Sequence, residues 1–225
     1  KFKIRTLKLP VDDGLIAAGG TVDLDGDADL QIAVRDVDIK PFLPLIGDNI
    51  NATGSITGVI NMTGATKNPK VELSASLANG SYNGIDIDQG FVLATMENHI
   101  INVQRIQGGK EDYKLSAYGK IPLAALYTTG YLDANDSKAM DMTIDFNEAN
   151  MAVIPLITPT VKDATGALKG VVHITGTIDQ PEAYGTVSVR DGTMKIKTIG
   201  NELKDIDGDL IFSGQQADFQ SRISA

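Results

Sequence analysis

Residues 52–64 read ATGSITGVINMTG, and residues 164–176 read ATGALKGVVHITG. The two stretches lie 112 positions apart, and the match continues without a gap, so that Pro69 falls on Pro181 and Gly80 on Gly192. A unit that recurs at a fixed spacing is typical of an extended protein built from stacked copies. The sequence therefore predicts an elongated fold made of repeats of about 112 residues.

Apolar side chains occupy alternate positions within the repeat. The first copy shows this at Ile56, Ile60 and Met62, and the second copy shows it at Leu168, Val172 and Ile174. A period of two is expected of a β-strand with one buried and one solvated face. Because the offset between the copies is even, equivalent side chains point to the same face of the sheet. We therefore expect an all-β protein with one apolar and one polar face.

The pattern predicts strands along most of the chain. They are expected at 2–9, 20–25, 29–39, 54–64, 70–78, 84–95, 99–107, 113–121, 140–147, 166–176, 182–190, 193–199, 203–212 and 216–224. Tight hairpin turns are expected at Asn79-Gly80, Asn83-Gly84, Asp191-Gly192 and Asp207-Gly208, because these pairs adopt positive φ angles readily. The only helical turn expected lies at 41–46.

Composition restricts the classes of function. The formal net charge is -9, with no cluster of Lys and Arg that could bind phosphates, so no nucleic-acid partner is expected. The chain has no Cys, which excludes disulfides and thiolate metal sites. No apolar run approaches the ~20 residues of a membrane helix. We expect residues 1–225 to form one continuous body cut from a longer protein, with repeats at about 20–130 and 131–225, the second of them truncated.

The second copy carries an ordered motif. From Gly166 it reads G-x-hydrophobic-x-G-x-hydrophobic-x-hydrophobic-x-G-T, then Pro181 after a few residues, then an alternating strand that ends at Asp191-Gly192. This series resembles the repeat of the TamB and AsmA-like envelope proteins, and the first copy resembles it less closely.

The resemblance implies an elongated antiparallel β-taco, which is a U-shaped sheet with an apolar concave groove. It also implies a periplasmic location, as part of a protein anchored in the inner membrane of a diderm bacterium. The implied function is the transport of lipid, as phospholipid or another acyl-chain ligand, along the groove between the inner and outer membranes. The implied protein partner is an Omp85-type outer-membrane barrel protein, contacted through regions outside this segment.

The residues favour a groove independently of the resemblance. A sheet with one apolar face must cover it, and a compact sandwich would use bulky aromatic side chains, whereas this chain has no Trp and 5% aromatic residues. The apolar positions hold aliphatic residues and Met, which form an adaptable lining. The predicted lipid-binding residues are Ile56, Ile60, Met62, Val71, Leu73, Leu77, Leu168, Val172, Ile174, Val187, Val189 and Ile196.

Other interpretations stay open at this point. The same aliphatic residues could form a closed core in a structural or adhesive stalk. The sheet could also guide the strands of nascent outer-membrane barrel proteins through its unpaired edges.

Enzyme chemistry has little support in the sequence. His99 is expected in a turn, and His173 is expected to face solvent without a partner, so neither suggests a metal or acid–base site. The acidic run 23–29 could ligate calcium but lacks the Gly and Glu of an EF-hand loop, and outward-facing acids around a turn explain it as well. We expect no catalytic residue, metal or cofactor.

Overall fold

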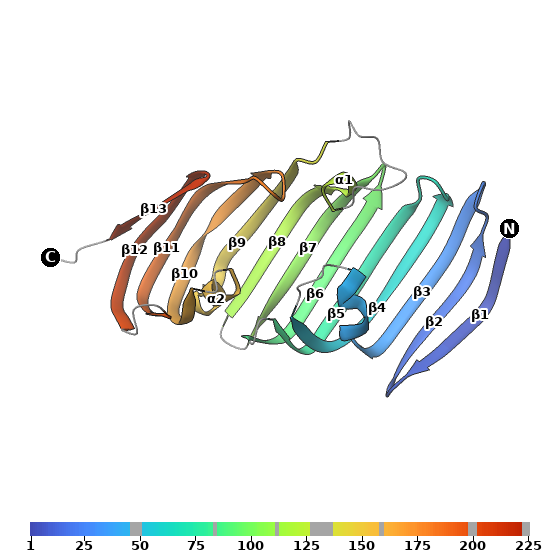
Figure 1. Cartoon of the computed structure of the whole chain (residues 1–225), viewed down its shortest axis with the longest axis horizontal. Helices are drawn as coiled ribbons and strands as arrows, with labels where there is room; N and C mark the ends of the chain where they lie inside the picture. Colours follow the sequence, from blue (N-terminus) through green and yellow to red (C-terminus); the bar gives the residue numbers. More distant parts are fainter. Residues whose placement is uncertain are drawn as a thin grey trace.

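The alternating pattern folds into one open antiparallel sheet in which every strand pairs only with its neighbours along the chain. The computed structural model describes residues 1–45, 51–82, 85–110, 113–126, 137–157, 160–197 and 202–221. Its thirteen strands are β1 (Phe2–Val11), β2 (Gly14–Val22), β3 (Asp27–Asp38), β4 (Ala52–Ala65), β5 (Lys70–Tyr82), β6 (Ile85–Glu97), β7 (Ile100–Lys110), β8 (Tyr113–Pro122), β9 (Met140–Asn150), β10 (Val161–Gly176), β11 (Pro181–Ile196), β12 (Glu202–Gly214) and β13 (Gln216–Ser221). Figure 1 shows them side by side, with β1 and β13 at opposite ends. The predicted elongated all-β antiparallel sheet is confirmed.

Short helices interrupt the sheet at three connections. They are η1 (Lys40–Leu45), α1 (Leu123–Leu126), and η2 (Met151–Val153) followed directly by α2 (Ile154–Ile157). The expected turn at 41–46 corresponds to η1, although position 46 lies outside the described residues. The other three helices were not predicted. Asn150 starts η2, because its side chain accepts a hydrogen bond of 3.0 Å from the backbone N–H of Ala152.

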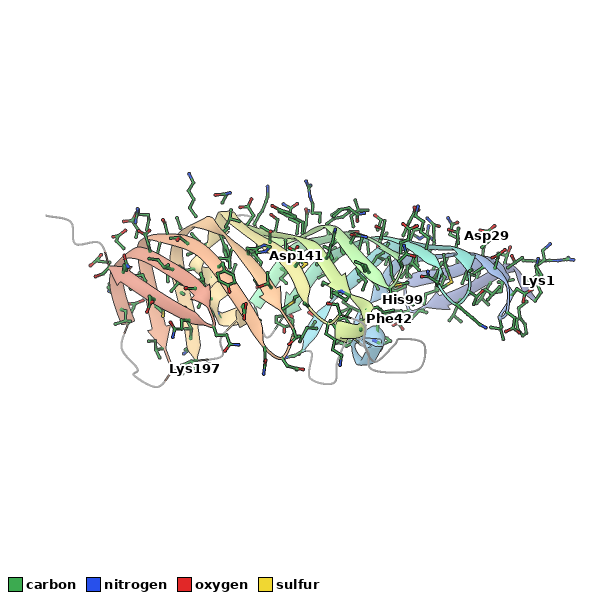
Figure 2. All side chains as sticks on the ribbon, turned by 90° about the horizontal axis from the view of Figure 1, so that it is seen from above. Lys1, Asp29, Phe42, His99, Asp141 and Lys197 are labelled. Atoms are coloured by element: carbon green, nitrogen blue, oxygen red, sulfur yellow. The ribbon has the colours of Figure 1, made fainter. Side chains whose placement is uncertain are left out.

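The strand register separates the two faces of the sheet. Residues directly opposite each other on antiparallel strands share a face. One row of such partners crosses all thirteen strands and contains only aliphatic residues, Phe and Gly: Leu9, Ile16, Val34, Gly58, Ala75, Val92, Ile106, Ala117, Ile144, Val172, Gly185, Phe212 and Ala217. We call the face that carries this row the apolar face, and the opposite one the polar face. Figure 2 shows Asp29 and Asp141, both on the polar face, along one long side of the molecule, and Phe42 of η1 on the other.

Two of the predicted hairpin turns lie inside strands instead. Asn79 and Asp191 have the expected positive φ, 49° and 48°, but they sit within β5 and β11, close to shifts in strand register. The positive φ therefore accommodates a β-bulge and not a chain reversal. As a result, the predicted strands 182–190 and 193–199 form the single strand β11.

The other turn predictions have different outcomes. Asp207-Gly208 lies inside β12, where the non-glycine residue with positive φ is Asp205 at 54°. Asn83-Gly84 falls outside the described residues. The two-residue turn between β6 and β7 is Asn98-His99, with φ angles of 51° and 59°, so the prediction that His99 lies in a turn is confirmed.

The pairing of β8 with β9 depends on a glycine. Gly119 of β8 has a φ of +144°, and a Cβ at this position would overlap with the backbone carbonyl oxygen of Asp141 on β9. Only Gly permits such close approach of two backbones. The residue therefore determines how tightly β8 and β9 pair.

Buried side chains gather mainly in the C-terminal part of the described chain, and elsewhere they are isolated, as at Val37, Ala94 and Val103. The largest cluster joins β9, β10 and β11 to η2. Overall the chain exposes 14208 Å², whereas a compact monomer of its mass would expose roughly 9,900 Å². A single-layer sheet with much of one apolar face uncovered accounts for this excess.

Candidate functional site

The predicted lining residues of the first copy lie together on the apolar face. Cross-strand partners in β4 and β5 are Ile56 with Leu77, Ile60 with Leu73, and Met62 with Val71. All six side chains are partly exposed. The arrangement forms a continuous aliphatic surface over two neighbouring strands.

Little of the chain covers this surface. Apart from neighbouring strands, the described element with substantial contact to β4 is η1, and the one with substantial contact to β8 is α1. Each of these helices is shorter than two α-helical turns. The aliphatic side chains of β4–β8 therefore lack a second layer formed by the described residues.

The predicted lining residues of the second copy are covered by the chain itself. Leu168, Val172, Val187 and Val189 are only 6%, 3%, 3% and 5% exposed. They belong to the cluster that includes Met151 and Val153 of η2, each 1% exposed. Segment η2–α2 packs on β10 at this point, so the apolar face is closed here while it is open over β4–β8.

The remaining two predicted residues are less buried than these four. Ile174 is partly exposed, faces Met142 of β9 and packs against the edge of the cluster. Ile196 is also partly exposed and pairs with Val161, where β10 begins and β11 ends. The predicted lining therefore consists of an open part in β4–β5 and a largely closed part in β10–β11.

His173 has partners that the sequence did not predict. Its Nε2 lies 3.7 Å from Oδ1 of Asp141, and its Nδ1 lies 3.5 Å from the hydroxyl of Thr143, both on β9. The side chain is 45% exposed on the polar face, in keeping with the predicted solvent-facing direction. The expectation that His173 has no partner is wrong, because the register of β9 and β10 places Thr143 directly opposite it.

The acidic run 23–29 forms the turn between β2 and β3 with residues 23–26 and begins β3 with residues 27–29. The backbone N–H of Gly26 donates to the carbonyl of Asp23, and the hydroxyl of Thr66 donates to the same carbonyl at 2.6 Å. Among the described residues, no three His, Asp or Glu side chains converge as metal ligands. The run thus works as a turn held by backbone and hydroxyl hydrogen bonds.

The pKa shifts arise from exposed pairs on the surface. A hydrogen bond and charge from Glu72, whose Oε1 lies 2.7 Å from Nζ of Lys70, raise the pKa of Lys70. A hydrogen bond to Glu182 raises the pKa of Tyr184. The ammonium of Lys195 lowers the pKa of Glu202. These pairs are exposed ion pairs and hydrogen bonds between neighbouring strands or alternate residues of one strand, so none marks a catalytic centre.

A hollow on the polar face was missed by sequence reasoning. It has a volume of about 780 Å³ and is lined by residues of β5, β6, β7 and β8. A smaller hollow of about 230 Å³ adjoins it toward β9 and shares Gln107 and Lys114 with it. No sequence motif indicates the two hollows, because their residues are brought together only by the register of five strands.

No described helix has the length and the apolar character needed to cross a membrane. No family model, curated protein or solved structure matches the chain.

Proposed function

We propose that the open part of the apolar face, over β4–β8, binds the acyl chains of phospholipid. The observation that carries the proposal is the unbroken apolar row across thirteen strands, combined with the lack of a second described layer over β4–β8. Exposed apolar surface on this scale marks an interaction site in soluble proteins. An aliphatic lining without bulky aromatic side chains suits a flexible hydrocarbon chain.

The energy of this interaction is sufficient for binding. About 14 methylenes of one acyl chain, at ~0.8 kcal/mol each, would contribute roughly 11 kcal/mol before the entropic cost of association. Because contact between aliphatic groups is non-directional, this gain has no preferred register along the row. A lipid could therefore move along the face from strand to strand, as transport requires.

Two finer features of the fold belong to the same proposal. The sheet would be a U-shaped β-taco with the apolar face on its concave side, and the chain would consist of two repeats of about 112 residues. The repeat is supported by equivalent element ends: β3 and β9 end at Asp38 and Asn150, and a helical segment then precedes β4 and β10 in each case. The second repeat differs from the first in that its helical segment seals the apolar face.

The cellular setting follows from the sequence resemblance to TamB and AsmA-like proteins. In that setting the chain is a periplasmic segment of a protein anchored in the inner membrane, and it carries lipid toward the outer membrane. An Omp85-type barrel protein would contact parts of the protein outside this segment. The role is non-enzymatic.

Photo-crosslinking tests the proposal directly. A photoreactive residue at Ile60 or Leu73 is expected to capture co-purified phospholipid, identified by mass spectrometry. The same residue at Glu72, on the polar face between them in sequence, is the matched control and should capture none. Position 172 is a second control, because Val172 is 3% exposed and sealed by η2. Equal capture on both faces, or none at Ile60 and Leu73, would overturn the proposal.

A second candidate function is suggested by the unpaired edges. Within the described residues, β1 and β13 each pair on one side only, so either could accept an extended polypeptide by adding a strand. A guide for outer-membrane barrel strands would crosslink to polypeptide at these edges and not to lipid at Ile60. A structural stalk would crosslink to neither.

A further inference from the structure

The hollow on the polar face crosses several strands in register. Ser76 of β5, Phe91 of β6, Gln107 of β7 and Ser116 of β8 are successive cross-strand partners. The smaller hollow continues this row to Asp145 on β9. Five strands at ~4.8 Å spacing give a trough roughly 19 Å long, perpendicular to the strands.

Small residues deepen the trough. Ala78 of β5 and Gly109 of β7 are the cross-strand partners of Gln89, and both line the larger hollow. Their small or absent side chains leave the backbone of the two strands accessible on the polar face. The trough is therefore a recess in the sheet and not only a space between long surface side chains.

The lining is rich in groups that donate and accept hydrogen bonds at the same time. Gln89 and Gln107 line the larger hollow, and Asn147 lines the smaller one. An amide side chain has both donors and acceptors, and a Ser hydroxyl likewise. Sugar hydroxyl groups have the same dual character, so amides and hydroxyls can pair with them whichever way they rotate.

An aromatic ring lies in the middle of this polar lining. Phe91 is 39% exposed, which is unusual for a Phe on the solvated face of a sheet. An exposed ring can stack on the apolar C–H face of a pyranose. The combination of an aromatic platform with surrounding amides is chemically suited to a carbohydrate.

Charge distinguishes a neutral ligand from an anionic one. In the smaller hollow, the carboxylate of Asp145 accompanies the two cations Lys114 and Arg105. A phosphate site would need converging cations without a carboxylate among them. The presence of Asp145 favours an uncharged polyol over an anion.

We infer that this trough, lined by Phe91, Gln89, Gln107 and Asn147 across β5–β9, binds a short linear oligosaccharide without net charge. One pyranose unit of an extended β-linked chain advances by about the distance between two strands, so successive sugars meet successive side chains of the row. The site lies on the face opposite the proposed lipid surface. Both ligands can be bound together, and the two proposals stand or fall separately.

Ligand-observed NMR and isothermal titration calorimetry on the whole chain test the inference. The probes are neutral β-linked tetrasaccharides, N-acetylated chitotetraose and cellotetraose, with inorganic phosphate as the anionic alternative. Saturable binding of at least one tetrasaccharide is expected, and Phe91→Ala and Gln107→Ala should each weaken it at least tenfold. Tyr184→Ala removes a comparably exposed aromatic ring on the polar face of β11, away from the trough, and should change the affinity less than twofold.

The outcomes separate the possibilities. Failure of both tetrasaccharides to bind the wild-type protein overturns the inference. So does binding of phosphate at the trough in their place, or an equal loss of affinity in Tyr184→Ala and Phe91→Ala. Phe91 is exposed, so its variant should retain the circular dichroism spectrum of the wild type. Lipid capture at Ile60 should persist in Phe91→Ala, which keeps this test independent of the proposed function.

Discussion

Truncation of Met151 compared with truncation of Met62 measures how unequally the apolar face is covered. Met151 is 1% exposed and belongs to the buried cluster of β9–β11, with its sulfur directly over Gly192. Met62 lies on the same face of the sheet but is partly exposed on β4. Both changes remove the same atoms, so the difference between them reports the environment alone.

The expected magnitudes follow from burial. Met151→Ala should lower the free energy of unfolding by about 3 kcal/mol, within the range of ~2–5 kcal/mol for a buried Met. Met62→Ala loses only part of the transfer free energy of a Met side chain and leaves no enclosed cavity, so about 1 kcal/mol is expected. With a urea slope of ~2.5 kcal/mol per molar, the midpoints should fall by about 1.2 M and 0.4 M.

Urea titration followed by far-UV circular dichroism is the suitable assay, because the chain has no Trp for fluorescence. Equal shifts of the two midpoints would refute the reasoning, since Met62 would then be as well covered as Met151. The open apolar surface over β4–β8, and with it the lipid proposal, would lose its basis.

Three further predictions concern the backbone and the surface charges. Gly119→Ala should lower the free energy of unfolding by about 2–5 kcal/mol in the same urea assay, because the position has a positive φ and an added Cβ overlaps with β9. Gly64→Ala is the control, since Gly64 has a φ of +86° and nothing lies within 4 Å of the added Cβ. It should lower the free energy of unfolding by only about 1–2 kcal/mol. The bulge at Asn79 requires a positive φ, so Asn79→Gly should leave the stability unchanged or raise it in thermal denaturation. Asn79→Ala should lower the stability by about 1 kcal/mol. If Asn79→Ala were more stable than Asn79→Gly, this explanation of the bulge would be excluded. Lys195→Gln should raise the pKa of Glu202 toward its ordinary value in an NMR titration; because the folded-state pKa is depressed, the stabilisation by this pair exists above the unfolded pKa and disappears as the pH falls through the folded pKa.

The period-two pattern was sufficient to predict most of the strands and their faces. The exceptions are β2 (Gly14–Val22), which was expected only at 20–25, and β11, which was expected as two strands. Alternation at Ile56, Ile60 and Met62 determines which side chains share the apolar face, and a shift of one residue would move all of them to the polar face. The register of β4 and β5 follows this pattern directly. That part of the candidate site was therefore accessible from the sequence.

The β-bulges and the helical segment that covers β10 could not be predicted from the sequence. Asn79-Gly80 has the local signature of a hairpin turn, and only pairing of β5 with both neighbours makes it a bulge. Segment η2–α2 spans residues 151–157, which is too short for helical periodicity to appear. Whether it covers β10 depends on tertiary packing, which the sequence pattern does not encode.

The trough on the polar face could not be predicted from the sequence for a different reason. Its residues come from positions 76–147 and lie together only because five strands pair in register. Phe91 reads in the sequence as one more member of a strand. Its exposure on the solvated face becomes visible only in the structure.

The odd number of strands in the sheet determines the path of the chain across it. In a meander of thirteen antiparallel strands, β1 and β13 run in the same direction, so the described chain enters the sheet at one of its two long rims and leaves at the opposite one. The connections that follow odd-numbered strands share one rim, and those that follow even-numbered strands share the other. Segments η1 and η2–α2, after β3 and β9, therefore lie at the same rim, and α1, after β8, lies at the opposite rim (Figure 1).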